Sequence, residues 1–265
     1  MSIQVEDLHY TYSSGTVALQ GVSLSIADGE RVAIVGQNGA GKTTLVRHLN
    51  GIFRATGGRV LVDGQDLAGR EIAELARTVG YVFQNPNEQL FARTVRAEVE
   101  FGPRNLGYDR ARRDELVDWA LTATRLTEHA TSHPYHLSLA ERKRVAIASV
   151  LAMDTPVVVF DEPTTGQDHA GVRDVSEVIA QLHARGRTVI AITHDMDFVA
   201  ENFDRVVAMA QGRVLADGTV HEVFADAEVV AGAAVEAPAM MRLAQGLGWT
   251  ESVTTVERFV AVLAR

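Results

Sequence analysis

The stretch 36-GQNGAGKT-43 arranges glycines, a lysine and a threonine in the spacing G-x-x-x-x-G-K-[ST], which is typical of a phosphate-binding loop. Glycines let consecutive backbone N–H groups wrap around phosphate oxygens, and a following helix adds positive potential at its N-terminus. We expect Lys42 to reach the β and γ phosphates of a nucleotide and Thr43 to offer its hydroxyl to Mg²⁺. The alternative, a glycine-rich turn without a ligand, is disfavoured because the motif is complete.

Two adjacent carboxylates, Asp161 and Glu162, follow the apolar run 157-VVVF-160. Open α/β sheets bind their ligands at the carboxyl ends of their strands. Neighbouring side chains along a strand point in opposite directions, so the two carboxylates can have separate roles. We expect Asp161 to help to hold Mg²⁺ and Glu162 to orient and deprotonate an attacking water. A solvated strand end that caps a helix is the alternative.

One histidine has a position that suggests chemistry. His194 follows the apolar run 188-TVIAI-192, so it should lie at the same sheet edge as the carboxylate pair and hydrogen-bond a γ-phosphate. A structural or simply exposed histidine is the alternative. A second group of histidines lies in a loop-like stretch with no helical ligand spacing, so we interpret it as structural rather than metal-binding: His129, His133 and His136.

These side chains must be positioned by the strands and helices that the hydrophobic pattern predicts. The run 31-RVAIVG-36 is typical of a buried central strand, and it leads through the glycine-rich loop into the helical stretch 43-TTLVRHLNGI-52. The runs at 157–160 and 188–192 enclose the helical stretch 170–186, a β-α-β pattern that predicts a parallel sheet. The predicted fold class is therefore α/β, with a parallel central sheet.

Other regions surround this core. Residues 3–12, 22–26 and 58–67 form short alternating stretches separated by turn residues, which predicts an N-terminal antiparallel β subdomain. Residues from about 87 to 153 are mostly helical and are interpreted as an inserted helical subdomain. We expect a small, peripheral helical tail over 221–265, which ends in an amphipathic stretch.

Composition narrows the class of protein. The 265 residues are 46% hydrophobic and 22% charged, which is ordinary for a soluble globular protein with a substantial core. The net charge of −9 argues against a nucleic-acid binder. Because the chain has no cysteine, disulfides, thiolate metal sites and thiol catalysis are excluded. We find no signal-peptide pattern and no apolar run near the roughly 18 residues of a membrane span.

The complete set of motifs resembles the ATP-binding subunits of ABC transporters, over roughly residues 1–220. The motifs occur in the family's order: 36-GQNGAGKTT-44, Gln84, 137-LSLAE-141, 157-VVVFDEP-163, Asp168 and His194. The stretch 80-GYVFQNPNEQLFARTVRAEVEFGPRNLG-107 is similar to the energy-coupling factor branch, whose members take up vitamins and transition-metal ions. The resemblance implies a nucleotide-binding domain with a phosphate-loop NTPase core over 1–220, and ATP and Mg²⁺ as ligands.

The resemblance also implies roles for individual residues. Tyr12 would stack on adenine, although a strand aromatic facing the core is an open alternative. Gln84 would touch Mg²⁺ or the attacking water, and Asp168 would lie at the contact between two ATPase chains. Phe91 and Phe101 would help to receive a helix of a membrane partner, or they are plain core. The remaining nucleotide contacts implied are Gly36, Asn38, Gly39, Ala40, Gly41, Lys42, Thr43, Thr44 and Ser138.

One segment departs from the family pattern L-S-G-G-Q, with which one chain presses on the γ-phosphate held by the other. Leu139 and Ala140 replace glycines and Glu141 adds a negative charge, while Ser138 and Glu141 fit a helix capping box. Either the backbone is ordinary helix and the segment still works, or it is a weakened signature. Gln167 also departs from the common pattern on the expected dimer surface, which favours an unlike partner over a symmetric homodimer.

The expected function is thus an ATP-hydrolysing subunit of an energy-coupling factor importer on the cytoplasmic face of the membrane. Its expected partners are a second ATPase subunit, a transmembrane coupling subunit and a substrate-binding membrane subunit, with no nucleic acid. A nucleic-acid or ribosome ATPase is disfavoured because no second ATPase half or basic surface is visible. A GTPase is disfavoured because no N-K-x-D motif occurs. A regulatory subunit in a pair that hydrolyses ATP at only one site remains an alternative.

Overall fold

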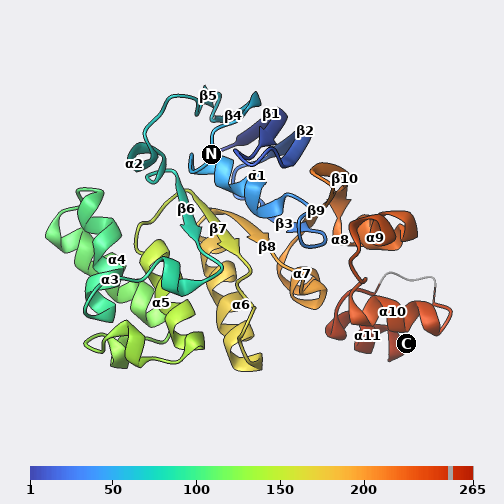
Figure 1. Ribbon diagram of the computed structural model, residues 1–265. Coiled ribbons are helices and arrows are strands. Elements are labelled where there is room, and N and C mark those ends of the chain that lie inside the picture. The colour runs from blue at the N-terminus through green and yellow to red at the C-terminus, as the bar shows by residue number, and fades with distance from the viewer. Residues whose placement is uncertain (250–252, 265) are drawn as a thin grey trace.

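Two β-sheets form the centre of the protein (Figure 1). The computed structural model describes residues 1–249 and 253–264. The first sheet has the order β2-β1-β4-β5 and is antiparallel, with β1 (Ile3–Thr11), β2 (Val17–Ile26), β4 (Gly57–Val62) and β5 (Gln65–Asp66). The second has the order β10-β9-β3-β8-β7-β6, with β3 (Arg31–Val35), β6 (Val79–Val82), β7 (Val157–Asp161), β8 (Thr188–Ile192), β9 (Arg205–Ala210) and β10 (Arg213–Thr219).

The second sheet confirms the predicted parallel core. Strands β6, β7, β8, β3 and β9 run parallel, and β10 alone pairs antiparallel, with β9. Every residue of β7 and β8 is buried, as expected for strands covered on both faces. Because parallel strands end at one edge, the residues that follow β3, β7 and β8 meet there.

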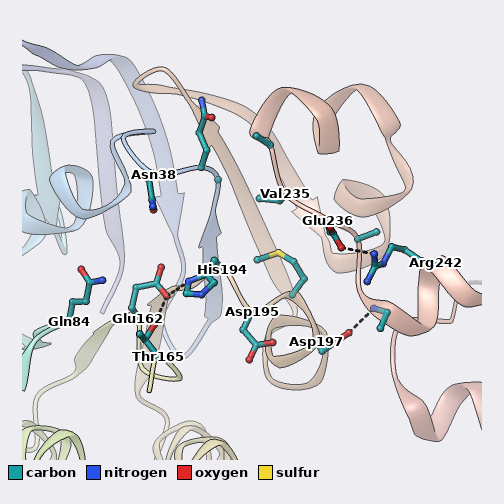
Figure 2. A pocket seen from close by; sticks show the side chains of 16 residues that line it. Asn38, Gln84, Glu162, Thr165, His194, Asp195, Asp197, Val235, Glu236 and Arg242 are labelled. Carbon is teal, nitrogen blue, oxygen red and sulfur yellow. Dashed lines mark hydrogen bonds and ion pairs between the residues drawn. The ribbon is translucent and has the colours of Figure 1, made fainter. Parts of the chain in front are cut away.

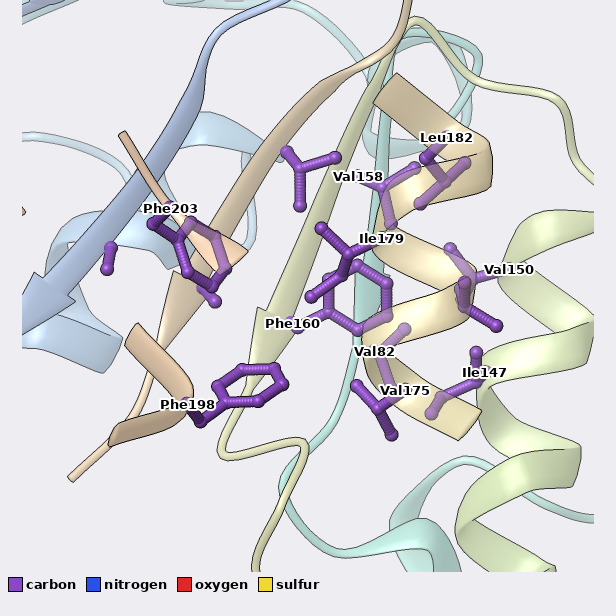
Figure 3. Packing of buried hydrophobic residues seen from close by; sticks show 14 of the residues in the cluster. Val82, Ile147, Val150, Val158, Phe160, Val175, Ile179, Leu182, Phe198 and Phe203 are labelled. Atoms are coloured by element: carbon purple, nitrogen blue, oxygen red, sulfur yellow. The ribbon is translucent and has the colours of Figure 1, made fainter. Parts of the chain in front are cut away.

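The two faces of this sheet contribute to different hydrophobic clusters. In β7, Val157 and Val159 pack with α1 (Lys42–Leu49) and the antiparallel sheet. Val158 and Phe160 point to the opposite face and pack against α5 (Leu139–Leu151) and α6 (His169–Ala184), as Figure 3 shows. This alternation is the period of two that a strand requires. It also determines toward which face of the sheet the side chain of Asp161, the last residue of β7, points.

The remaining helices surround the sheets. Those between β5 and β7 are α2 (Ile72–Leu75), α3 (Val95–Asn105) and α4 (Arg110–Ala123), together with α5 and the short 3-10 turns Pro86–Glu88, Thr127–His129 and Pro134–His136. Helices α3, α4 and α5 pack together on one side of the sheet in Figure 1, where the helical insertion was predicted. Helix α7 (Met196–Asn202) follows β8.

Helix α1 is shorter than the predicted stretch 43–52. It ends at Leu49 because Asn50 leaves helical geometry and Gly51 has a φ of 75°, a left-handed conformation that favours glycine. The Asn50 side chain then accepts a hydrogen bond from the Ile52 N–H at 3.2 Å, which completes the turn. The prediction was therefore wrong at the C-terminal end of this helix.

The C-terminal region is helical. It contains α8 (Val220–Ala225), α9 (Ala227–Ala233), α10 (Ala239–Gly246) and α11 (Val256–Leu263). Val223 and Phe224 are buried in the same cluster as the sheet, whereas α11 has no buried residue. Of the predicted amphipathic stretch 252–265, the two end residues lie outside the described part. The boundary at residue 220 remains a prediction. No helix among the described residues is long and apolar enough to cross a bilayer.

Candidate active site

The loop between β3 and α1 is shaped by glycines that no other residue can replace. Gly36 has a φ of 142°, and a Cβ there would lie 2.1 Å from the Met209 carbonyl oxygen. Gly41 has a φ of 99°, and a Cβ there would lie 2.7 Å from the Ala18 carbonyl oxygen. Both conformations are strained for residues with a side chain. The loop is therefore held close to neighbouring backbone, with α1 starting at Lys42.

Lys42 is buried beneath this loop. Its Nζ donates hydrogen bonds to the Gly36 carbonyl at 2.6 Å and to the Gln37 carbonyl at 3.0 Å. Burial lowers the pKa of Lys42, against the opposing effect of Glu162 and Asp161. The ammonium is thus held in place by loop carbonyls, where it can exchange those partners for phosphate oxygens.

A cavity of about 270 Å³ brings most of the predicted nucleotide contacts together. Its lining combines the first sheet, the glycine loop and the ends of β7 and β8. The predicted residues that line it are Tyr12, Asn38, Gly39, Ala40, Gly41, Lys42, Thr43, Thr44, Gln84, Asp161 and Glu162. A neighbouring cavity of about 660 Å³, shown in Figure 2, shares Asn38, Gln84 and Glu162 with the first, so the two have one connected wall. Gly36 and His194 line this second cavity.

Asp161 ends β7 with each carboxylate oxygen near a different group. Thr43 Oγ1 donates to its Oδ1 at 3.4 Å, and the Tyr81 hydroxyl donates to its Oδ2 at 2.6 Å. Tyr81 is buried, and desolvation followed by the Asp161 charge raises its pKa above the usual range, so it remains a donor. Tyr81 lies within the stretch 80–107 that resembles the energy-coupling factor branch, but nothing in that stretch marks its hydroxyl as a partner of Asp161.

The oxygens of Thr43 and Asp161 are hard ligands of the kind that Mg²⁺ prefers. Among residues 1–249 and 253–264, no group of three or more histidine or acidic side chains could hold a metal by itself. A magnesium ion here would depend on phosphate oxygens and water for the rest of its shell, which is its usual mode in nucleotide sites.

Glu162 and His194 form an ion pair or hydrogen bond at the end of the sheet. The distance from His194 Nδ1 to Glu162 Oε2 is 2.7 Å, and Thr165 Oγ1 donates to the same oxygen at 3.4 Å. The Glu162 side chain is 9% exposed and that of His194 is 69% exposed. Glu162 also has a φ of 52°, an uncommon conformation for a glutamate. Figure 2 shows this pair facing the cavity beside Gln84.

Tyr12 and Gln84 both line the smaller cavity. The Tyr12 hydroxyl hydrogen-bonds Thr44 Oγ1 at 2.8 Å, and its ring packs edge-on to Tyr10 and Phe53. Tyr12 is only partly buried, so it is not simply a core aromatic. Gln84 is exposed and lines both cavities.

Ser138 is the predicted site residue that the structure does not bring into either cavity. It caps α5: its Oγ accepts from the Glu141 N–H, while Glu141 Oε2 accepts from the Ser138 N–H at 2.8 Å and hydroxyl at 2.7 Å. These bonds lower the pKa of Glu141. Leu139 and Ala140 have ordinary helical backbone, so replacing the family's glycines causes no backbone strain here.

The second departure from the family pattern contacts the first. Gln167 Nε2 donates to the Ala140 carbonyl at 3.3 Å, and Leu139 is 50% exposed. Asp168 caps α6 by accepting from the Gly171 N–H at 2.8 Å. Of the three loop histidines, His133 caps a 3-10 turn by accepting from the Tyr135 N–H, and His129 Nε2 lies 3.5 Å from Glu141 Oε1.

The C-terminal region supplies a wall of the larger cavity that sequence analysis missed. Val235, Glu236 and Arg242 line it opposite His194 (Figure 2). The Gln37 N–H of the glycine loop donates to the Ala233 carbonyl at 2.8 Å, which joins this region to the phosphate loop. No motif marks these residues, and the small side chains around them gave no signal.

Comparison with known proteins defines the class. A family model for ABC transporters matches residues 19–165, which span the glycine loop, the helical insertion and the carboxylate pair. The dimeric structure of an ATP-binding cassette in a post-hydrolysis state with ADP and Pi aligns with a TM-score of 0.75 at 27% identity, covering 82% of this chain and 98% of that one. The chain therefore belongs to the ABC transporter ATPases and has their fold.

More similar proteins define the branch. The energy-coupling factor transporter ATP-binding proteins of Methanocaldococcus jannaschii and Methanospirillum hungatei are 40% and 41% identical over 253 and 246 residues. These alignments cover 95% and 92% of this chain and 91% and 89% of the relatives. The chain belongs to this family of energy-coupling factor ATPases, as its motifs indicated.

Two other comparisons bear on the size and the assembly of such proteins. The structure of cbiO1 from Clostridium perfringens, part of the ABC transporter complex cbiONQ, aligns with a TM-score of 0.77 and 39% identity, covering 86% of this chain and 92% of that one. An ABC transporter ATP-binding protein of Methanosarcina acetivorans is 43% identical over 245 residues, or 92% of this chain. This chain spans only 40% of that relative's length.

Proposed function

We propose that this chain hydrolyses magnesium ATP at the cavity between its two sheets, and that hydrolysis powers an energy-coupling factor importer for a vitamin or a transition-metal ion. The importer places the chain on the cytoplasmic face of the membrane. The observation that carries the proposal is the convergence of Lys42, Asp161 and the Glu162–His194 pair on one connected cavity wall.

Binding is assigned to the glycine loop and the first sheet. The loop N–H groups and the N-terminus of α1 favour a polyphosphate, and Lys42 neutralises its charge. Thr44 contacts a phosphate oxygen, and Tyr12 stacks on the base, a contact worth about 1–3 kcal/mol by analogy with other nucleotide stacking. The hydrogen bond between the Tyr12 and Thr44 hydroxyls supports this assignment, because it places the aromatic ring beside the phosphate loop.

Hydrolysis is assigned to the sheet edge. Glu162 accepts a proton from the attacking water, and His194 orients its carboxylate through Nδ1 while its exposed ring reaches the γ-phosphate. Gln84, which lies beside Glu162 in the cavity lining, orients the same water. Thr43 and Asp161 would hold Mg²⁺. When bound, the ion neutralises charge on the transferred phosphoryl group.

A second ATPase chain completes the site. Ser138 lies outside its own chain's cavities, and its helix N-terminus is available to an anion held by a partner. The helical backbone of α5 is ordinary, so the weakening comes from Glu141 alone: it occupies the Ser138 hydroxyl and adds negative charge there. On this ground the chain offers a weakened signature. We therefore favour a heterodimer, in which the partner supplies the stronger signature to this chain's Glu162.

A groove beside the helical insertion fits the transmembrane coupling subunit, which in turn holds the substrate-binding membrane subunit. Phe91 and Phe101 stack edge-to-face at 4.7 Å and are 62% and 47% exposed. Buried Glu98 accepts from the N–H groups of Phe91 and Ala92, which holds the rim in place. Tyr81 lines the same groove, of about 290 Å³, and its hydroxyl donates to Asp161, the proposed Mg²⁺ ligand. An apolar helix docked in the groove would therefore contact Tyr81 and, through it, affect Asp161.

The test is ATP turnover per chain across a wide protein concentration range, with Glu162→Gln in parallel. We expect turnover that saturates as dimers form, and a Glu162→Gln variant that binds ATP but scarcely hydrolyses it. If wild type binds ATP and is inactive, turnover should appear on adding an ATPase chain with an L-S-G-G-Q segment. Failure to hydrolyse with that chain as well would leave a regulatory nucleotide-binding subunit and contradict the proposal.

A further inference from the structure

Lys143 is a buried cation that the proposed reaction does not use. It lies in the second turn of α5 and is 2% exposed. Its Nζ donates to the Glu162 carbonyl and, at 3.0 Å, to the Thr165 carbonyl. Neither contact is with a carboxylate, so this is not an ordinary salt bridge. The ammonium instead bridges the two ends of the turn 162–165.

That turn carries the group assigned as the general base. Glu162 has left-handed backbone at a φ of 52°, which costs a non-glycine residue about 1 kcal/mol and persists only where surrounding contacts hold it. The Glu162 N–H donates to the Ile192 carbonyl at 2.9 Å, and its carbonyl accepts from Lys143. Both backbone groups of this residue are thus anchored, one by the neighbouring strand and the other by α5.

The burial of this ammonium is costly, which argues against a mere space-filling role. Burial lowers the pKa of Lys143 to about 8, even though Glu162 and Asp161 act in the opposite direction. An apolar side chain would fill the same space without that cost. The three donors of an ammonium, however, can hold two carbonyls at once, which an apolar side chain cannot do.

We propose that Lys143 is a positioning residue that holds the turn 162–165 so that the Glu162 carboxylate faces His194 and the attacking water. This inference rests on the proposed role of Glu162 as the base. Lys143 also connects α5 to the Glu162 backbone within one chain. Since it follows the Ser138–Glu141 capping box by less than one turn, it links the segment 137–141 to the catalytic carboxylate.

The first experiment reads the Glu162–His194 contact directly and needs no turnover. The nitrogen NMR shift of His194 Nδ1 is compared in wild type, Glu162→Gln, Lys143→Met and Lys143→Gln. We expect Lys143→Met to move the signal most of the way to its Glu162→Gln position. Lys143→Gln, whose amide can still donate to a carbonyl, should move it less. A wild-type shift in folded Lys143→Met overturns the proposal whatever the ATPase rate is. If that variant does not fold, Lys143→Leu, which also lacks a donor, is read in the same way.

The second experiment separates positioning from general damage. Lys143→Met should lower kcat by about 10- to 100-fold, the range that a misplaced catalytic group costs, with KM and ATP affinity within twofold. In a Glu162→Gln background the same change should alter the residual single-turnover rate by less than twofold. An equal loss in both backgrounds would show that Lys143 acts independently of Glu162.

The matched control is Arg187→Met. It also removes a partly buried cation, which pairs with Asp154 at 2.6 Å just before β8, at the opposite end of the sheet from the site. It should leave the His194 signal and kcat near wild type while lowering the melting temperature. If wild type itself lacks turnover with every partner chain, the proposed function fails, but the NMR comparison still decides the role of Lys143.

Discussion

His194 Nδ1 lies 2.7 Å from Glu162 Oε2, although 32 residues separate them in the chain. The contact forms because β7 and β8 are neighbouring parallel strands whose ends meet at one edge. It gives the carboxylate a single preferred direction toward the cavity. An imidazole that donates from Nδ1 leaves Nε2 free for a phosphate oxygen or for solvent.

Replacing His194 tests this contact. We expect His194→Ala to lower kcat by about 10²-fold or more, within the range of general acid–base contributions, because Glu162 loses its orienting donor. Steady-state ATPase rates and ATP affinity measured together would check it. Near-normal kcat would show that the pair is not used in the reaction.

The contact between Tyr81 and Asp161 predicts a change in metal affinity. Tyr81→Phe removes the hydroxyl that donates to Asp161 Oδ2 at 2.6 Å and leaves the ring in place. Loss of such a supporting bond commonly costs about 10- to 100-fold in metal affinity. Mg²⁺ titrations of ATP binding should therefore shift to higher concentration. An unchanged titration would mean that Asp161 is positioned without Tyr81.

The capping box of α5 predicts that a less acidic signature binds ATP better. Glu141→Gln removes a negative charge beside the helix N-terminus, which is worth roughly 0.3–1 kcal/mol to a bound anion, or about two- to fivefold. ATP-driven association with a partner chain should strengthen by that factor. Its measurement by analytical ultracentrifugation at several ATP concentrations checks the direction.

Helix α8 offers the control for that change. Thr219 and Glu222 form the same capping box, with both Thr219 donors 2.8 Å from Glu222 Oε2. Glu222→Gln should weaken the cap of α8 as Glu141→Gln weakens the cap of α5. It should not, however, strengthen ATP-driven association with a partner chain. Equal effects of the two variants on association would exclude a specific role for Glu141.

Lys143 predicts a pH dependence of stability. Its pKa is about 8 in the folded protein and near 10.5 when exposed in the unfolded chain. Between pH 8 and 10.5 the Lys143 amine is mostly neutral in the folded protein and mostly protonated in the unfolded chain. Because the unfolded state binds more protons, stability rises with pH over this range. The contribution is of the order of 3 kcal/mol, because the two pKa values differ by about 2.5 and each whole pKa unit corresponds to about 1.4 kcal/mol.

Comparison with a variant isolates this contribution from other titrating groups. The difference in free energy of unfolding between wild type and Lys143→Met should change in favour of wild type over that window. Urea denaturation at several pH values measures it. A difference that stays constant with pH would show that the ammonium is not buried as described.

Much of this site follows from local sequence. The glycine loop, the carboxylates after an apolar strand and the histidine after the next one are each defined within a few residues. Strand and helix periods also placed β3, β7 and β8 correctly, since burial on both faces produces continuous apolar runs. The parallel order then requires that the ends of these strands meet, so the sequence by itself determined the family, the fold and most of the cavity lining.

The tertiary structure decided what touches those residues from far along the chain. The hydroxyl of Tyr81 on Asp161, the ammonium of Lys143 on the Glu162 carbonyl and the Ala233 carbonyl on the Gln37 N–H all join distant segments. No local pattern marks such pairs, because each depends on how the sheet edge, α5 and the C-terminal helices pack. Sequence specified the groups that do the chemistry, and packing decided which other groups hold them in place.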